Sequence, residues 1–316
     1  MKLISIVIPA FNEESCIDEL SQRLIKVFEK NANYDFEVII VENGSTDQSF
    51  VMLEKLNQRD KRFKIVQLAR NFRMDGGLTA GLHYAKGDAV VLMTADLQDP
   101  PELITDFIKR WEEGYENVYM VVTKRNGTGP LRTFNSKAFY WLAGKLTDNR
   151  IPKNASDFRL IDRKVYEAVR NMDERNRFVR GLVAWVGFSS IGIEAERAER
   201  FGGESKAHSL KVIDLAFKGI FSHSYIPLKV ITLSGIAISA LSFMSFLIFA
   251  IVWLARGVPF AGFGTLVSLI LMVSGFFTFM LGIISEYIGL IYEEVKRRPN
   301  FVVSKEIGFS SFHVEN

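Results

Sequence analysis

The sequence has little cysteine, little histidine and little net charge. Its single cysteine, Cys16, excludes an internal disulfide, and the four histidines are too scattered along the chain for a zinc site. The formal net charge is only +3 over 316 residues, whereas nucleic-acid-binding domains concentrate lysine and arginine on one face. We therefore expect no nucleic-acid partner, and a chain that faces the reducing cytosol.

Apolar residues are abundant, at 48% of the chain. Two long runs near the C-terminus, residues 230–255 and 263–284, carry no charge. Each exceeds the roughly 20 residues that a helix needs to cross the hydrocarbon of a bilayer. Two buried helices in a soluble core are the alternative, but such helices usually keep a polar face. The sequence predicts a hairpin of two transmembrane helices, at about 230–255 and 263–285.

The charges that flank this hairpin predict its orientation. Lys229 precedes it and the basic stretch Lys296–Arg298 follows it, so the positive-inside rule places both ends in the cytoplasm. No signal peptide is expected at the N-terminus, which becomes acidic too early. We expect a multi-pass protein of the inner (plasma) membrane, in which residues 1–206 form a cytosolic domain, 229–290 the membrane region and 291–316 a cytosolic tail.

Residues 207–228 link the cytosolic domain to the hairpin. Apolar residues recur there at three- and four-residue spacing, with Lys211 and Lys218 on a flanking stripe. This pattern predicts an amphipathic helix at the membrane surface. An ordinary helix packed on the soluble domain is the alternative.

The N-terminal half alternates apolar strands with helical stretches. Such alternation predicts an α/β fold with a mostly parallel sheet covered by helices on both faces. Ligands of open α/β sheets bind beyond the carboxyl ends of the strands. The expected strands are Leu3–Pro9, Phe36–Glu42, Phe63–Ala69, Ala89–Ala95 and Asn117–Thr123.

Polar clusters follow the first four of these strands: "PAFNEE", "ENGSTD", "ARNFRMDGG" and "TADLQDPPE". A single cluster is explained by a turn or a helix cap, but four at consecutive strand ends predict a shared site. Asp96 and Gln98 are separated by one residue, so in an extended segment they point the same way and offer oxygen ligands to Mg²⁺ or Mn²⁺. A loop carboxylate without a ligand is the alternative for Asp96.

Several motifs carry a resemblance to a known family. In chain order, "SIVIPAFNEE", "VENGSTD", "ADLQDPPE", "SDFRLIDRKV", "RFVRGL", "RFGGESK" and "EYIGLIYEEVKRRP" resemble the polyprenyl-phosphate glycosyltransferases of glycosyltransferase family 2. Bactoprenol glucosyltransferases are the most similar, and dolichyl-phosphate mannose synthases are more distant. The resemblance covers nearly the whole chain. It implies a GT-A fold, and transfer of a hexose from a nucleotide sugar to polyprenyl (undecaprenyl) phosphate at the cytosolic membrane face.

The resemblance also implies roles for individual residues. Asp157 matches the acid at the reacting centre, and Asp96 and Gln98 match metal and diphosphate positions, Asp96 counting also as catalytic. The positions implied to hold the nucleotide are Pro9, Phe11, Asn12, Glu13, Glu42, Asn43, Arg70 and Asp75. Those implied to hold the phosphate or the acceptor are Arg125, Arg132, Ser136, Arg200, Ser205 and Lys206. For Arg200 and Lys206 a solvated charged surface is the alternative.

Further partners follow from the same resemblance. By analogy with relatives we expect a homo-oligomer, a tetramer, and a separate flippase would move the lipid-linked product across the membrane. Two departures from the family pattern concern the donor site. Thr94 stands where an Asp-Ala-Asp motif has its first acid, and Glu42-Asn43 replaces a common Asp-Asp. Without one carboxylate, metal binding should be weaker, or a water molecule should take the place of that ligand.

The chemistry of a phosphate acceptor agrees with this assignment. A phosphate monoester has a second pKa near 6, so the attacking oxygen is already anionic and needs little help from a base. Cations and a metal must instead stabilise the two anions that meet. Asp157 would then orient the sugar or the cations, and a single displacement would invert the anomeric centre, which gives a β-linked product from an α-linked donor.

Other functions share parts of this pattern. UDP-glucose is the expected donor, while N-acetylglucosamine, mannose or an aminosugar would suit the same site. A processive polysaccharide synthase should carry a Gln-x-x-Arg-Trp segment and more membrane spans, and the sequence has neither. A non-catalytic membrane scaffold that retains a sugar-nucleotide fold is the second alternative, and Thr94 favours it.

Overall fold

The computed structural model describes residues 1–125, 154–175, 177–198 and 262–309, together with scattered residues between 231 and 255. The chain divides into two compact units. One holds residues 1–144, 149–208 and 298–316, and the other holds 145–148 and 209–297. Each unit is described by itself.

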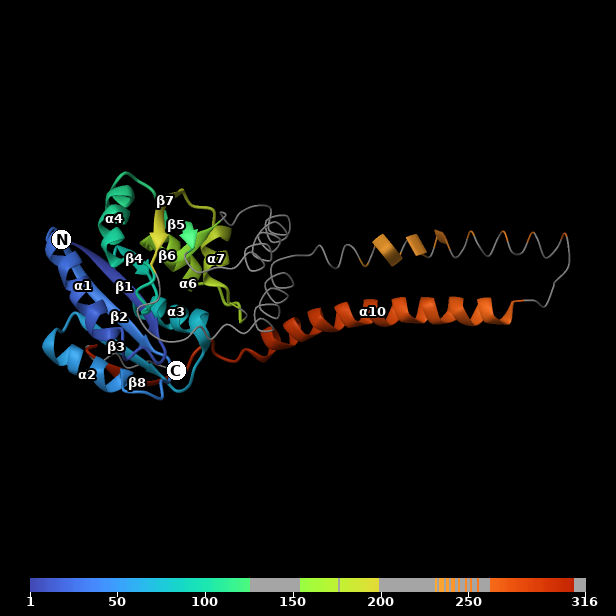
Figure 1. Ribbon diagram of the computed structural model, residues 1–316, viewed down its shortest axis with the longest axis horizontal. Helices are drawn as coiled ribbons and strands as arrows, with labels where there is room; N and C mark the ends of the chain where they lie inside the picture. The colour runs from blue at the N-terminus through green and yellow to red at the C-terminus, as the bar shows by residue number, and fades with distance from the viewer. Residues whose placement is uncertain are drawn as a thin grey trace. The chain divides into compact units, whose positions relative to one another are not determined.

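The first unit is built on an eight-stranded sheet of order β7-β5-β6-β4-β1-β2-β3-β8 (Figure 1). β1 pairs in parallel with β2 and β4, β2 with β3, and β5 with β7, whereas β6 and β8 are antiparallel to their neighbours. The strands are β1 (Lys2–Ala10), β2 (Tyr34–Glu42), β3 (Phe63–Leu68), β4 (Ala89–Leu92), β5 (Asn117–Arg125), β6 (Ala155–Asp162), β7 (Ser190–Arg197) and β8 (Val303–Ile307). The predicted mostly parallel α/β sheet is confirmed.

Helices cover both faces of this sheet, because successive side chains of a strand point to opposite faces. Ile4, Ile6 and Ile8 of β1 lie in one buried cluster and Val7 lies in the other. The first face carries α1 (Ile17–Lys30), α2 (Ser49–Arg59) and α4 (Ile104–Glu112), which follows the short 3₁₀ turn η1 (Pro101–Leu103). The opposite face carries α3 (Arg73–Tyr84), α6 (Arg163–Arg170) and α7 (Val179–Trp185).

Two glycines set α3 directly on β1. A Cβ atom at Gly81 would lie 2.1 Å from Cγ1 of Val7, and one at Gly77 would lie 2.9 Å from Cβ of Pro9. Both distances are far below van der Waals contact, so only glycine allows this approach. The start of α3 is thereby held beside the carboxyl end of β1.

The strands that sequence analysis missed are β6, β7 and β8. β6 lies between β4 and β5, so the predicted strand at Asn117–Thr123 is not a direct neighbour of β4. β6 carries the half-buried Asp157 and the buried Arg159 within an otherwise apolar stretch, and these charges interrupt the apolar run that usually marks a central strand. β4 ends at Leu92, earlier than predicted, because the chain turns there toward the site.

Residues 298–309 return to the sheet of the first unit. β8 pairs with the edge strand β3, and the backbone N–H of Ala69 donates to the carbonyl of Val302 at 2.9 Å. The Tyr84 hydroxyl donates to Glu306, and its ring lies 4.9 Å from that of Phe309. The expected boundary of a tail at 291–316 is therefore corrected: residues 298–316 belong to the first unit. A five-residue, half-polar strand gives little signal without its partner.

The second unit contains α10 (Phe263–Lys296), 34 residues long. Within the described residues it is the one helix long and apolar enough to cross a membrane, over Val273–Lys296, and none of that window is buried. Phe279 and Leu281 are 66% and 61% exposed. The predicted span at 263–285 lies inside α10, while the predicted span at 230–255 and the amphipathic helix at 207–228 lie largely or wholly outside the described residues.

Candidate active site

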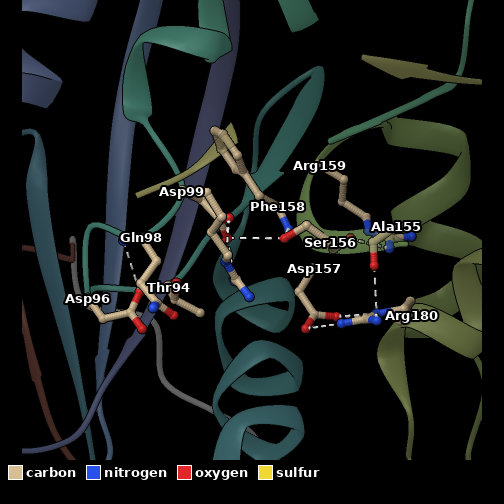
Figure 2. A network of polar contacts seen from close by, with 11 residues as sticks. Thr94, Asp96, Gln98, Asp99, Ala155, Ser156, Asp157, Phe158, Arg159 and Arg180 are labelled. Atoms are coloured by element: carbon tan, nitrogen blue, oxygen red, sulfur yellow. Dashed lines mark hydrogen bonds and ion pairs between the residues drawn. The ribbon is translucent and has the colours of Figure 1, made fainter. Parts of the chain in front are cut away.

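A tight turn follows β4 and carries the predicted metal ligands. Asp96 is 6% exposed, and its Oδ1 accepts hydrogen bonds from the Thr94 hydroxyl at 2.8 Å and from the Gln98 backbone N–H at 3.3 Å (Figure 2). Leu97, with φ of 57° and a buried side chain, makes the turn. The assumption of an extended segment was therefore wrong. The turn brings Asp96 and Gln98 together because Asp96 caps the backbone of its own loop.

The next acid of this loop, Asp99, is held by an arginine. Its two oxygens accept from Nε and Nη2 of Arg197 at 3.0 and 2.9 Å, and Oδ2 also accepts from the Ser156 hydroxyl at 3.1 Å (Figure 2). Burial raises the pKa of Asp99, an effect that Arg197 opposes. The N–H of Ala198 donates to the Gln98 carbonyl at 3.0 Å. Asp99 therefore ties the loop that follows β4 to β6 and to the end of β7.

Asp157, the predicted acid of the reacting centre, forms an ion pair with Arg180 of α7. Nε of Arg180 donates to Oδ1 of Asp157 at 2.7 Å, its Nη2 donates to Oδ2, and its Nη1 donates to the Ala155 carbonyl at 3.1 Å (Figure 2). Burial alone would raise the pKa of Asp157, but Arg180 and then Arg159 hold that pKa below its usual value. Asp157 is therefore a carboxylate at neutral pH.

Arg159 adds a second positive charge behind Asp157. Its side chain is 3% exposed, and Nη2 donates to the Ser156 carbonyl at 2.9 Å. Burial, and then Arg180, lower the pKa of Arg159 to about 10. The cluster of one acid and two arginines therefore carries net positive charge, which suits a site where anions meet.

The loops after β1 and β2 are joined to each other. Asn12, at φ 54°, receives the Thr46 N–H on its Oδ1 at 2.8 Å and donates its own N–H to the Ser45 hydroxyl at 3.0 Å. The N–H of Glu13 donates to the hydroxyl of Ser49 at 2.9 Å. These bonds fix the positions of the half-buried Phe11, Asn12 and Glu13, at the carboxyl end of β1 beyond Pro9.

Glu42 ends β2 with an unsatisfied acceptor. Its side chain is fully buried, and Oε1 accepts from the Ser45 N–H at 2.5 Å. Within the described residues Oε2 has no hydrogen-bond partner. A buried carboxylate oxygen left without a donor is costly, so Glu42 is placed to receive an N–H or O–H from a ligand.

Asn43, which follows β2, forms two hydrogen bonds with the loop before α3. Its Nδ2 donates to the Arg73 carbonyl and its Oδ1 accepts from the Phe72 N–H, both at 2.8 Å, and the side chain is 3% exposed. The side-chain amide of Asn43 therefore holds the loop before α3.

The two remaining predicted nucleotide residues lie on or beside α3. Arg70 is exposed, and its guanidinium lies 4.0 Å from the centroid of the Phe72 ring. Asp75 is half-buried and its Oδ1 accepts from the Val179 N–H of α7 at 3.0 Å. Burial raises the pKa of Asp75 to about 6, and the charge of Asp157 adds to the rise.

Comparison with known proteins decides the family. The family model described as "Glycosyl transferase family 2" matches residues 5–170, just over half of the chain. The chain belongs to glycosyltransferase family 2. This glycosyltransferase is 42% identical over 314 residues to an uncharacterized glycosyltransferase of Synechocystis, a match that covers 99% of this chain and 98% of that protein.

Other relatives have more specific names. The SfII prophage-derived bactoprenol glucosyl transferase of Shigella flexneri is 36% identical over 302 residues, covering 96% of this chain and 97% of that protein. Glucosyl-3-phosphoglycerate synthase from Mycobacterium tuberculosis, solved with Mn²⁺, UDP and phosphoglyceric acid, shares the fold. Its TM-score is 0.50 at 17% identity, over 70% of this chain and 76% of that one.

The predicted acceptor residues of this glycosyltransferase are mostly not described. The backbone of Arg125 pairs with Arg197 between β5 and β7, and its side chain lies outside the described part. The other predicted acceptor residues, Arg132, Ser136, Arg200, Ser205 and Lys206, also lie outside it.

Sequence reasoning missed the arginines that grip the acids, Arg180 and Arg197, and the role of Asp99. Arg180 stands in "RFVRGL" and Asp99 in "ADLQDPPE", motifs that carried the family resemblance. Spacing alone does not pair residues about 23 or 98 positions apart. These pairings exist only because β6 and β7 enter the sheet beside β4 and β5.

Proposed function

We propose that this glycosyltransferase transfers a hexose, with glucose from UDP-glucose as the first candidate, to polyprenyl phosphate. The observation that carries the proposal is the match of 33–36% identity, over 96% of the chain, to bactoprenol glucosyl transferases. The lipid acceptor and the sugar in those names are taken over to this chain as a proposal. The geometry of the site supports it in three steps.

The nucleoside of the donor would bind at the ends of β1 and β2. Oε2 of Glu42 is a buried acceptor without a donor in the described residues, and a nucleoside offers N–H and O–H donors of the kind it lacks. The loop of Phe11, Asn12 and Glu13 is fixed beside it by hydrogen bonds from the next loop.

A divalent ion, Mg²⁺ or Mn²⁺, would be held by Asp96 and Gln98. Within the described residues no three His, Cys, Asp or Glu side chains gather into a metal site, and Asp99 is occupied by Arg197. One carboxylate and one amide oxygen fit an ion that takes its other ligands from water and a diphosphate. When bound, such an ion neutralises charge on the departing diphosphate.

The transfer itself needs no proton from the protein. An acceptor phosphate oxygen attacks the anomeric carbon, a new C–O bond forms, and the bond to the diphosphate breaks with its electron pair leaving on the diphosphate. Asp157 is a carboxylate held by Arg180, so it suits orientation of sugar hydroxyls rather than proton donation. Arg200, Ser205 and Lys206 would grip phosphate. The N–H of Ala198, two residues before Arg200 in sequence, donates to the Gln98 carbonyl at 3.0 Å.

The acceptor would be reached at the membrane. α10 is apolar and exposed over Val273–Lys296, and burial in hydrocarbon would cover that surface. The second span at 230–255, the cytosolic orientation and the plasma-membrane location are part of the proposal. The tetramer, by analogy with relatives, and a separate flippase for the product stay predictions.

The test uses the full chain purified in detergent. It is incubated with undecaprenyl phosphate, Mn²⁺ and a panel of UDP-sugars, and the lipid fraction is analysed by mass spectrometry. A single hexose on the lipid phosphate from UDP-glucose supports the proposal, and a product from another donor alone changes the sugar. Binding of UDP without any lipid product would identify the scaffold alternative, and a lengthening glycan would identify a processive synthase.

A further inference from the structure

The N-terminus of α7 is capped by a side chain from another helix. The first N–H groups of a helix have no partner within it, and Phe178, the residue before α7, supplies no side-chain cap. Asp75 of α3 supplies one instead: its Oδ1 accepts from the N–H of Val179, the first residue of α7, at 3.0 Å.

The turn that Asp75 caps carries the arginine of the reacting centre. Arg180 follows Val179 directly, and its guanidinium donates to both oxygens of Asp157 and to the Ala155 carbonyl. A shift in the first turn of α7 would therefore move the guanidinium that holds the Asp157 carboxylate. The hydrogen bond from Val179 to Asp75 joins residues 104 apart in sequence, so it ties the start of α7 to α3.

The start of α3 is itself fixed from the nucleoside side of the sheet. Asn43, next to Glu42, holds the backbone of Phe72 and Arg73. Gly77 lies against Pro9 of β1, where a Cβ atom would meet Cβ of Pro9 at 2.9 Å. Contacts therefore run without a break from the end of β2, through α3 and Asp75, to α7 and Asp157.

We infer that Asp75 is a positioning residue for the transfer: by capping α7 from α3, it sets the Asp157–Arg180 pair relative to the nucleoside end of the sheet. This inference rests on the proposed function. It assigns Asp75 a role through Val179 and Arg180, in place of the nucleotide contact predicted from the sequence.

Charged groups on every side of Asp75 make this cap sensitive to pH. Asp157 of β6 raises the pKa of Asp75, while Arg180 of α7 and Arg177 in the preceding segment lower it, and burial, the largest effect, brings the pKa to about 6. As pH falls through that value the carboxylate becomes neutral, and the cap loses its charge-assisted hydrogen bond. The rate of transfer should therefore decline on the acid side.

The test compares Asp75→Ala, which removes the acceptor, with Asp75→Asn, which keeps an acceptor oxygen of the same size. Misplaced reacting groups lose roughly 10- to 100-fold in rate, so kcat of Asp75→Ala should fall by about that factor at pH 7.5, while UDP affinity with Mn²⁺, measured by titration calorimetry, stays as in the wild type. Asp75→Asn keeps an acceptor oxygen without the charge, so its kcat should match the lower rate that the wild type reaches below pH 6 and should show no decline there. Asp106→Asn, an exposed acid on α4, is the control and should match the wild type.

Amide hydrogen exchange at Val179 gives a readout that does not depend on transfer. Protection should be lost in Asp75→Ala and kept in Asp75→Asn. Wild-type kcat in Asp75→Ala, or loss of UDP binding in both variants, would overturn the inference, the second because Asp75 would then touch the donor. If the wild type transfers no sugar, the proposed function fails together with the catalytic part of this inference, and exchange at Val179 still decides whether Asp75 caps α7.

Discussion

Glu42 and Asp157 are both carboxylates at the rim of one sheet, the first fully buried and the second half-buried, and the structure treats them in opposite ways. Glu42 ends a parallel strand and leaves Oε2 without a partner among the described residues. Asp157 starts the antiparallel strand β6, and both of its oxygens are held by Arg180. The parallel half of the rim thus keeps hydrogen-bonding capacity for a ligand, whereas the other half uses arginines to fix its acids.

This difference follows from the charge of the ligand groups that we expect each half of the rim to bind. In the proposed site a neutral nucleoside offers N–H and O–H donors, and a buried glutamate supplies an acceptor for them. The reacting centre must bring two anions together, so bare carboxylates there would repel them. Arg180 and Arg159 around Asp157 reverse the local charge. Four substitutions test this comparison, from the largest expected effect to the smallest.

Asp96 lies where the two halves meet, and its removal should have the largest effect. Asp96→Ala takes away the carboxylate that we expect to hold the metal, and loss of charge stabilisation in a transition state costs roughly 100- to 1000-fold in kcat. Steady-state transfer at saturating Mn²⁺ measures it. Asp18→Asn, at the exposed start of α1, should leave kcat unchanged. Full activity of Asp96→Ala would show that Asp96 does not hold a metal that the transfer needs.

Asp157→Asn should slow the transfer step and leave the affinity for the donor unchanged. The variant leaves Arg180 and the buried Arg159 without their carboxylate, so we expect kcat to fall about 100-fold while calorimetric UDP affinity is kept. Because the pKa of Asp157 lies below its usual value, the carboxylate stabilises the fold above the usual titration range of Asp and loses this effect only as pH falls through the lowered pKa.

Asp157 should therefore not limit the rate between pH 5 and 8. Asp173→Asn, whose side chain is 96% exposed, is the matched control for thermal stability and kcat. A parallel loss of UDP affinity in Asp157→Asn would show that the two halves are not separable.

Glu42→Gln should weaken binding of the donor and leave the transfer step nearly unchanged. The NH2 group of the new amide is a donor, and it can face the donor that we expect from the ligand. An unpaired buried polar group costs about 1–3 kcal/mol, which corresponds to roughly 10-fold weaker UDP binding. Calorimetry with Mn²⁺ measures this, and kcat at saturating donor should change little. Glu29→Gln, exposed at the end of α1, is the control. Unchanged UDP affinity would place the nucleoside elsewhere.

Thr94→Val should have the smallest effect. It removes the hydroxyl that donates to Oδ1 of Asp96 at 2.8 Å and keeps the side-chain shape, and one such hydrogen bond contributes about 1 kcal/mol. The apparent affinity for Mn²⁺ in the transfer assay should fall about 5-fold, with kcat at saturating Mn²⁺ retained. Affinity equal to the wild type would mean that Thr94 does not orient Asp96.

The apolar runs were sufficient to predict β1 to β5, and the polar clusters marked the rim where the first four of them end. Their residues are buried on both faces, so an almost continuous apolar stretch marks each strand. β6 and β7 escaped because Asp157, Arg159 and the half-exposed pattern of β7 break that signal. β8 escaped because its pairing with β3 joins segments that lie far apart in the chain.

Residue types along the chain determined that this protein has a sheet with polar strand ends, an apolar helix over residues 263–285 and carboxylates beyond the first four strands. Those features depend on local periodicity and composition, which are read directly from neighbouring residues. Only the tertiary structure decided which carboxylates are paired, that Asn43 holds a loop, and that Asp75 caps α7. These depend on contacts between residues up to 104 positions apart, which no local pattern specifies.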